Sequence, residues 1–166
     1  MVQALQENQA IFAQHGGRRR RFDKRLRARC QATPLKIKQG YPRRKLARYM
    51  LVALEEAHEH KELVDTTTAT MEHIMPQTLS DEWKAALGPE YKAVHEKWLD
   101  TIGNLTLTGY NSELGNDPFE QKQRMLQNTH FELSRPLLNE EAWGATEIEA
   151  RGKRLAELAV RRWGRD

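Results

Sequence analysis

Two short stretches of this sequence have the composition of β-strands, and both lie in a chain that otherwise looks helical. The first, VDTTTATMEHIM, is rich in β-branched residues and ends near His73, before Pro76 stops it. The second, NLTLT, begins after Gly103. The sequence therefore predicts an α+β fold that is predominantly helical, with one small sheet surrounded by helices.

Hydrophobic periodicity predicts the helices around these strands. The strongest pattern runs from Arg43 to about His60, where apolar residues recur on one face of RRKLARYMLVALEEAHEH. Tyr110 to Asp117 is expected to be a loop or a short turn. Further helices are predicted over 2–14, within the arginine-rich stretch that follows it, and over 80–87, 91–100, 118–128 and 147–163. The predicted core anchors are Trp83, Trp98, Trp143 and Trp163.

Length and composition limit the class of protein. The 166 residues are enough for one compact domain, and we expect residues 1–41 to be a basic helical extension or linker and residues 42–166 to form the domain. No run approaches the roughly 18 apolar residues of a membrane span, and no secretory signal is readable, so a cytoplasmic location is expected. Cys30 is the only cysteine, which excludes an intrachain disulfide and a zinc site built from several thiolates.

Positive charge is concentrated in one segment. Arg18 to Arg48 holds 14 Lys or Arg against Asp23 alone, so the remaining residues must be net acidic for the chain to total +4. Such a segment is typical of a phosphate-binding arm, although a solvated linker or a targeting patch has the same composition. The predicted DNA-binding residues are Arg18, Arg19, Arg20, Arg21, Lys24, Arg25, Arg43 and Arg44.

Three stretches carry candidate chemistry for hydrolysing a phosphodiester, which needs an activated nucleophile and a cation that absorbs charge. Glu72 and His73 place a carboxylate beside an imidazole. Neighbours in a strand point to opposite faces, but a turn at 74–76 would let both serve one site. Asn104 can reach across from the second strand, or it can satisfy backbone groups of the turn before that strand. Asn111 can present a hard oxygen ligand facing Glu72.

The string EHIMPQ, followed by IGNLTLTGYNSELGNDPFEQK, resembles an HNH nuclease signature. It is similar to that of the C-terminal domain of GmrSD-type restriction endonucleases, which are modification-dependent anti-phage proteins. A related string with paired asparagines occurs in the HNH domain of the RNA-guided CRISPR nucleases. The resemblance covers about residues 42 to 163. It implies a small ββα-metal core, also called a His-Me finger, within the α+β fold.

The resemblance also implies roles for single residues. His73 matches the general base that deprotonates water, and Glu72 matches the acidic metal ligand before it. Asn111 matches the residue that completes the metal site, while Asn104 matches a position that orients the base or braces the loop. Lys122 matches a basic position expected near the scissile phosphate. Two departures are the Glu in place of the commoner Asp before the histidine, and the Asn in place of a final His.

From the resemblance we expect a metal-dependent DNA endonuclease that nicks or cuts double-stranded DNA in a restriction or antiviral defence system. The expected cofactor is one Mg²⁺ or Mn²⁺ ion, and neutral His73 should lose its function as the pH falls below about 6.5. An upstream ParB-like NTPase or nuclease domain is the expected partner, and a homodimer is possible. The alternatives are a catalytically silent DNA-binding module and an RNA-directed nuclease.

Overall fold

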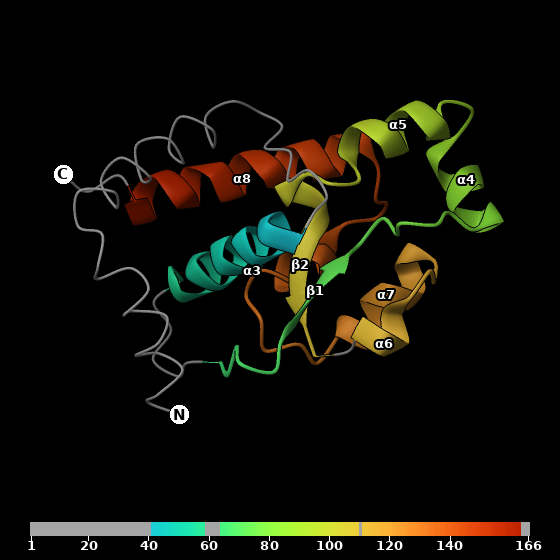
Figure 1. The fold of residues 1–166 in the computed structure, drawn as a ribbon. Helices are drawn as coiled ribbons and strands as arrows, with labels where there is room; N and C mark the ends of the chain where they lie inside the picture. Colours follow the sequence, from blue (N-terminus) through green and yellow to red (C-terminus); the bar gives the residue numbers. More distant parts are fainter. Residues whose placement is uncertain (1–40, 59–63, 110, 164–166) are drawn as a thin grey trace.

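The structure is a computed structural model that describes residues 41–58, 64–109 and 111–163 (Figure 1). The described residues form two β-strands, six α-helices and two 3-10 helices, and the predicted elements among them follow the predicted order along the chain. The elements are α3 (Tyr41–Glu56), β1 (Thr70–His73), α4 (Asp81–Leu87), α5 (Tyr91–Trp98), the 3-10 helix η1 (Ile102–Asn104), β2 (Leu105–Thr108), α6 (Asn111–Leu114), α7 (Phe119–Leu126), the 3-10 helix η2 (Arg135–Asn139) and α8 (Ala145–Trp163). Within the described ranges, none of these helices is long and apolar enough to cross a membrane.

The sheet consists of β1 and β2, paired antiparallel, with His73 opposite Leu105 and Glu72 opposite Thr106. The predicted α+β class with a predominantly helical fold is confirmed. In Figure 1 the two strands lie in the middle of the molecule, with α3 and α8 on one side and α6 and α7 on the other. The sheet thus separates two layers of helix, and side chains from alternate strand positions enter different layers.

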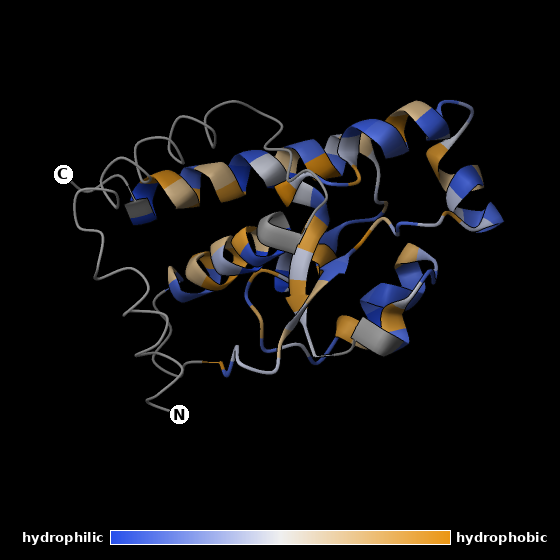
Figure 2. Cartoon of the chain, viewed as in Figure 1, coloured by the Kyte–Doolittle hydropathy of each residue, from blue (hydrophilic) through white to orange (hydrophobic). Residues whose placement is uncertain are grey.

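Two apolar clusters hold these layers together. One joins α3, α8 and the sheet through residues such as Leu51, Leu54, Leu107 and Leu155. In Figure 2 orange and blue segments alternate along α3 and α8, as expected for helices with one apolar face. The other cluster contains residues of α4, α5, α6, α7, η2 and α8. Three of the predicted core anchors belong to it: Trp83, Trp98 and Trp143. The prediction that these three residues are core anchors is confirmed, whereas the side chain of Trp163 lies outside the described set.

A close contact between η1 and α8 fixes the start of β2. A Cβ atom on Gly103 would lie 2.1 Å from the carbonyl oxygen of Ile148, so only glycine allows this approach. The fully buried guanidinium of Arg151 on α8 donates to the carbonyl oxygens of Gly103 and Leu105 at 2.7 Å and of Leu133 at 3.0 Å. Burial lowers the pKa of Arg151 to about 9, so its guanidinium stays charged at neutral pH.

The ends of the described helices that were predicted agree with the prediction to within a few residues, whereas β1 is shorter than the predicted strand and begins only at Thr70. Ser80 caps α4, accepting from the backbone N–H of Trp83 at 3.4 Å, and Pro118 directly precedes α7. The segment expected to be a loop or short turn contains the one-turn helix α6, and η2 was not predicted. The helices expected over 2–14 and in the arginine-rich stretch lie outside the described residues.

Candidate functional site

The end of β1 places Glu72 and His73 in different environments. The strand continues through His73, and the bend at 74–75 comes only afterwards. Glu72 therefore lies on the sheet face of Thr106, and His73 on the face of Leu105. The bend lies where the turn was expected, but it does not bring the two side chains to one side, because the strand alternation extends through His73.

Glu72 forms a buried ion pair with Lys122 of α7. The Lys122 ammonium lies 2.6 Å from Glu72 Oε1 and also donates to the carbonyl oxygen of His73 at 2.9 Å. Burial raises the pKa of Glu72 and lowers the pKa of Lys122, since desolvation outweighs the attraction between the partners. Lys122 has 0% exposed surface, and its ammonium ties α7 to the end of β1. Its expected place near the scissile phosphate stays a prediction.

His73 is partly exposed and lies beside Asp100. Its Nε2 lies 3.3 Å from Oδ1 of Asp100, and the two side chains are 14% and 28% exposed. Burial lowers the pKa of His73, an effect that Asp100 opposes and the positive charges of Arg44 and Lys122 reinforce. The imidazole is therefore neutral near pH 7 and available to accept a proton.

Asn104 is fully buried and uses its whole amide as a brace. Its Oδ1 accepts from the backbone N–H of Met75 at 2.8 Å and from the indole N–H of Trp143 at 3.0 Å. Its Nδ2 donates to the carbonyl oxygens of Met75 at 2.9 Å and Leu99 at 3.0 Å. The bracing alternative for this asparagine fits these contacts. A catalytic contact with substrate does not, because the amide has no exposed surface.

The structure describes the other predicted site residues only in part. Asn111 begins α6, which contacts both β1 and α7, but its side chain is not among those described. Arg44 is exposed on α3, close enough to His73 for its charge to lower the histidine pKa. Arg43 lies beside it in α3, and its side chain is not described. The predicted DNA contacts at Arg18, Arg19, Arg20, Arg21, Lys24 and Arg25 lie outside the described residues.

Among the described side chains, Glu72 offers a hard oxygen ligand suited to an open magnesium site with few protein ligands. Lys122 occupies only Oε1 of Glu72, and a carboxylate with two oxygens can accept further partners. An amide oxygen from Asn111 would be a second hard ligand, and Mg²⁺ commonly keeps several waters. Within the described ranges no group of three His, Cys, Asp or Glu residues could hold a metal. The described residues therefore do not form a metal site with three or more such ligands.

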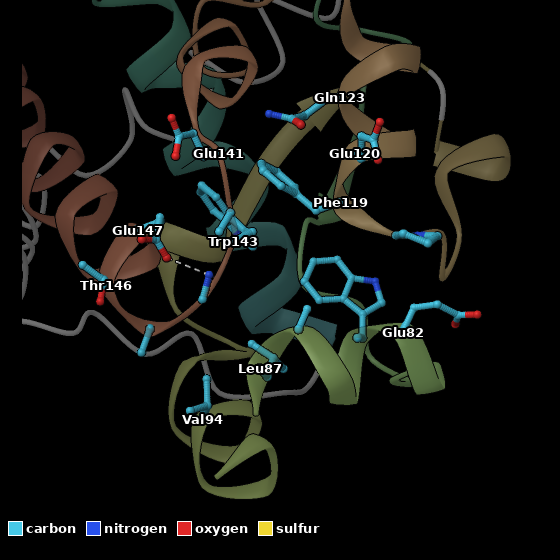
Figure 3. Close-up of a pocket in the computed structure, with 16 residues that line it drawn as sticks. Glu82, Leu87, Val94, Phe119, Glu120, Gln123, Glu141, Trp143, Thr146 and Glu147 are labelled. Atoms are coloured by element: carbon cyan, nitrogen blue, oxygen red, sulfur yellow. Dashed lines mark hydrogen bonds between the residues drawn. The ribbon is translucent and has the colours of Figure 1, made fainter. Parts of the chain in front are cut away.

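A pocket is lined by residues of α4, of α7 and of the start of α8 (Figure 3). Phe119 and Trp143 stack along its wall, with ring centroids 5.4 Å apart and an interplanar angle of 26°. Carboxylates also line it, and none of the described residues lining it is Lys or Arg. The carboxylates belong to Glu82, Glu120, Glu141 and Glu147. Such a lining repels a polyanion, so the pocket is unsuited to a DNA backbone.

Sequence reasoning missed Asp100 and the indole of Trp143. Asp100 stands four residues before Asn104 in WLDTIGN, beyond the end of α5, and no short-range pattern pairs it with a residue 27 positions earlier. Trp143 was expected only as an apolar anchor. A sequence signal for its second role is the rule that a buried indole N–H usually finds an acceptor.

Comparison with known families gives one match. The profile described as GmrSD restriction endonucleases, C-terminal domain, matches residues 23–158. Searches of curated proteins and of solved structures returned no match. The matched region includes both strands, His73, Asn104 and Lys122, and it covers most of the chain. The chain therefore belongs to the GmrSD restriction endonuclease family and matches its C-terminal domain.

Proposed function

We propose that the chain is an HNH-type endonuclease that hydrolyses DNA phosphodiester bonds, with His73 as the general base. The observation that carries the proposal is a neutral, partly exposed imidazole at the end of β1, held by a carboxylate and flanked by positive charge. Family membership supports nuclease activity in restriction. The order β1, β2, α6 supports a ββα core, since α6 contacts β1.

The residues around His73 have separate tasks in this proposal. The unprotonated ring nitrogen accepts the proton of the attacking water, while the ring stays anchored through Nε2. Arg44 contributes positive charge near the base and is suited to hold a DNA phosphate. Lys122 and Asn104 keep the strand end and the following loop in place through buried hydrogen bonds. These two side chains position the site without touching the substrate.

We propose one divalent ion, Mg²⁺ or Mn²⁺, held by Glu72 and Asn111. When bound, the ion would supply electrostatic stabilisation of negative charge on the phosphate and the leaving oxygen. The open coordination described above suits a site completed by water and phosphate oxygens.

Double-stranded DNA is the proposed substrate. We propose that the basic segment from Arg18 to Arg48 binds its backbone phosphates. Each domain carries one candidate base and would therefore nick one strand, so a double-strand break requires two domains or two events. We propose an intracellular role in antiviral restriction, together with an upstream NTPase or nuclease domain. A catalytically silent DNA-binding module is the second candidate, since Arg44 and the basic segment suffice for binding alone.

A plasmid assay tests this proposal. Supercoiled plasmid should convert to the open circular form when the protein and Mg²⁺ or Mn²⁺ are present, and EDTA should stop the conversion. Substrates carrying modified and unmodified bases, and a single-stranded RNA of similar length, would reveal the preference. Binding without conversion under all metal conditions would contradict the enzymatic proposal and favour the DNA-binding module.

A further inference from the structure

We infer that Asp100 is a positioning residue for His73, holding the Nε2 proton so that the opposite ring nitrogen, Nδ1, carries the lone pair that accepts the proton of water. The inference rests on the proposed function and deepens it. It names the nitrogen that reacts and the residue that selects it.

The contact between the two side chains fixes the direction of the hydrogen bond. Nε2 of His73 lies 3.3 Å from Oδ1 of Asp100. An ionised carboxylate can only accept, so the ring nitrogen facing it must donate. In a neutral imidazole the other nitrogen then has no proton. Asp100 thereby favours the tautomer whose Nδ1 can serve as a base.

The placement of Asp100 in the fold suits this role. It follows α5, and the next residue, Thr101, is anchored by a hydrogen bond from its hydroxyl to the carbonyl oxygen of Trp98 at 2.8 Å. Three residues later the buried amide of Asn104 bonds both Leu99 and Met75. Asp100 and His73 thus stand on two segments that Asn104 ties together. The carboxylate is held against the ring by two braced backbones.

A carboxylate suits this position for a second reason. A base must hold a proton briefly after taking it from water. The carboxylate of Asp100, with Oδ1 at 3.3 Å from Nε2, stabilises the imidazolium that forms. Glu72, the other acid in the site, is paired with Lys122 and does not face the ring.

The first test reads the tautomer directly, without catalysis. Protein labelled with ¹⁵N in its histidines, at neutral pH in EDTA, would be measured by two-bond ¹H–¹⁵N correlation, with His73→Ala used to assign the signals. Wild type should show a protonated Nε2 and an unprotonated Nδ1. Asp100→Asn should shift the ring towards a tautomer mixture, because an amide can present either its oxygen or its N–H group. Asp81→Asn, an exposed acid paired with Lys84, is the matched control and should leave the spectrum unchanged.

The second test measures cleavage by the same variants. Asp100→Asn should lower kcat by about 10- to 100-fold with little change in KM, as expected when an outer carboxylate that orients a functional histidine is lost. Asp100→Glu, which restores a carboxylate, should recover part of kcat. An unchanged tautomer in Asp100→Asn would overturn the inference even if the protein cuts DNA. If no variant or wild type cuts DNA while the tautomer still depends on Asp100, the proposed function fails instead. Weaker Mg²⁺ binding by Asp100→Asn, with an unchanged tautomer, would also overturn the inference and identify Asp100 as a metal ligand.

Discussion

Helix α7 contributes to two regions that use charge in opposite ways. In one, Lys122 reaches the end of β1, where its ammonium neutralises the buried Glu72. In the other, Phe119 and Gln123 line a pocket whose carboxylates have no cation among the residues lining it (Figure 3). The pocket is concave and aromatic, yet its charge opposes a polyanion. Charge and proton-accepting groups therefore locate the candidate nuclease site better than concavity does.

The largest expected effect is the loss of stability when the buried ion pair of Lys122 and Glu72 is broken. Lys122→Met should lower the free energy of unfolding by about 3–5 kcal/mol, because it leaves the Glu72 carboxylate buried without its partner. Combining it with Glu72→Gln should recover most of that loss, since burial already shifts both pKa values towards the neutral forms. Urea unfolding measures both variants. Lys84→Met, in an exposed ion pair, is the control and should change little. Equal stability of Lys122→Met and wild type would contradict the structural role of the pair.

Asn104 joins the two regions, and its loss should affect both. Asn104→Ala leaves the backbone of Met75 and the indole N–H of Trp143 without partners, at a cost of about 1–3 kcal/mol for each unsatisfied group. We expect lower thermal stability, together with a change in Trp fluorescence from the pocket wall. Asn128→Ala, in the exposed turn after α7, is a suitable control. Retained stability with unchanged fluorescence would show that Asn104 does not connect the end of β1 with the pocket wall.

The pH dependence of cleavage should report the environment of His73. The histidine acts as a base only when neutral, and burial lowers its pKa from the ordinary value of 6.5. Cleavage should therefore persist to below pH 6.5 and then fall by about tenfold per pH unit, as the imidazole gains a proton. Single-turnover rates at saturating metal would measure this limb. An acid limb centred well above pH 6.5 would contradict the buried environment.

The smallest expected effects distinguish the two surfaces in DNA binding. Arg44→Gln should weaken binding to all sequences and reduce the slope of log affinity against log salt by about one, as for the loss of one phosphate contact. Glu141→Gln in the pocket should leave that slope unchanged. Fluorescence anisotropy over a salt series measures both. A larger change of the salt slope in Glu141→Gln than in Arg44→Gln would contradict this expectation and place the DNA at the acidic pocket.

The sequence predicted the fold well because local signals determine it. Helical periodicity in Arg43–His60, the β-branched residues before His73 and the cap at Ser80 all act over a few residues. The contacts of the site are long-range. Lys122 meets Glu72 across 50 positions, and His73 meets Asp100 across 27. The resemblance identified Lys122 as important, but its burial follows from how α7 packs on β1, which no local pattern specifies.

The orientation of Glu72 and His73 is a second feature that depends on long-range contacts. Strand alternation already favoured opposite faces, and a turn at 74–76 was expected to override it. The bend lies there, at 74–75, but His73 still belongs to the strand, and its backbone carbonyl accepts from Lys122. A hydrogen bond from a distant helix thus stabilises the extended strand end, which no local pattern predicts.

The most direct test of the account compares His73→Ala with His130→Ala, an exposed histidine elsewhere in the chain, for plasmid nicking at neutral pH with Mg²⁺. Thermal unfolding and DNA affinity would be measured for both variants. With His73 as the general base, His73→Ala should lose at least about 100-fold in nicking rate with fold and affinity retained, while His130→Ala should cut like wild type. Nicking by His73→Ala at the wild-type rate would contradict this role.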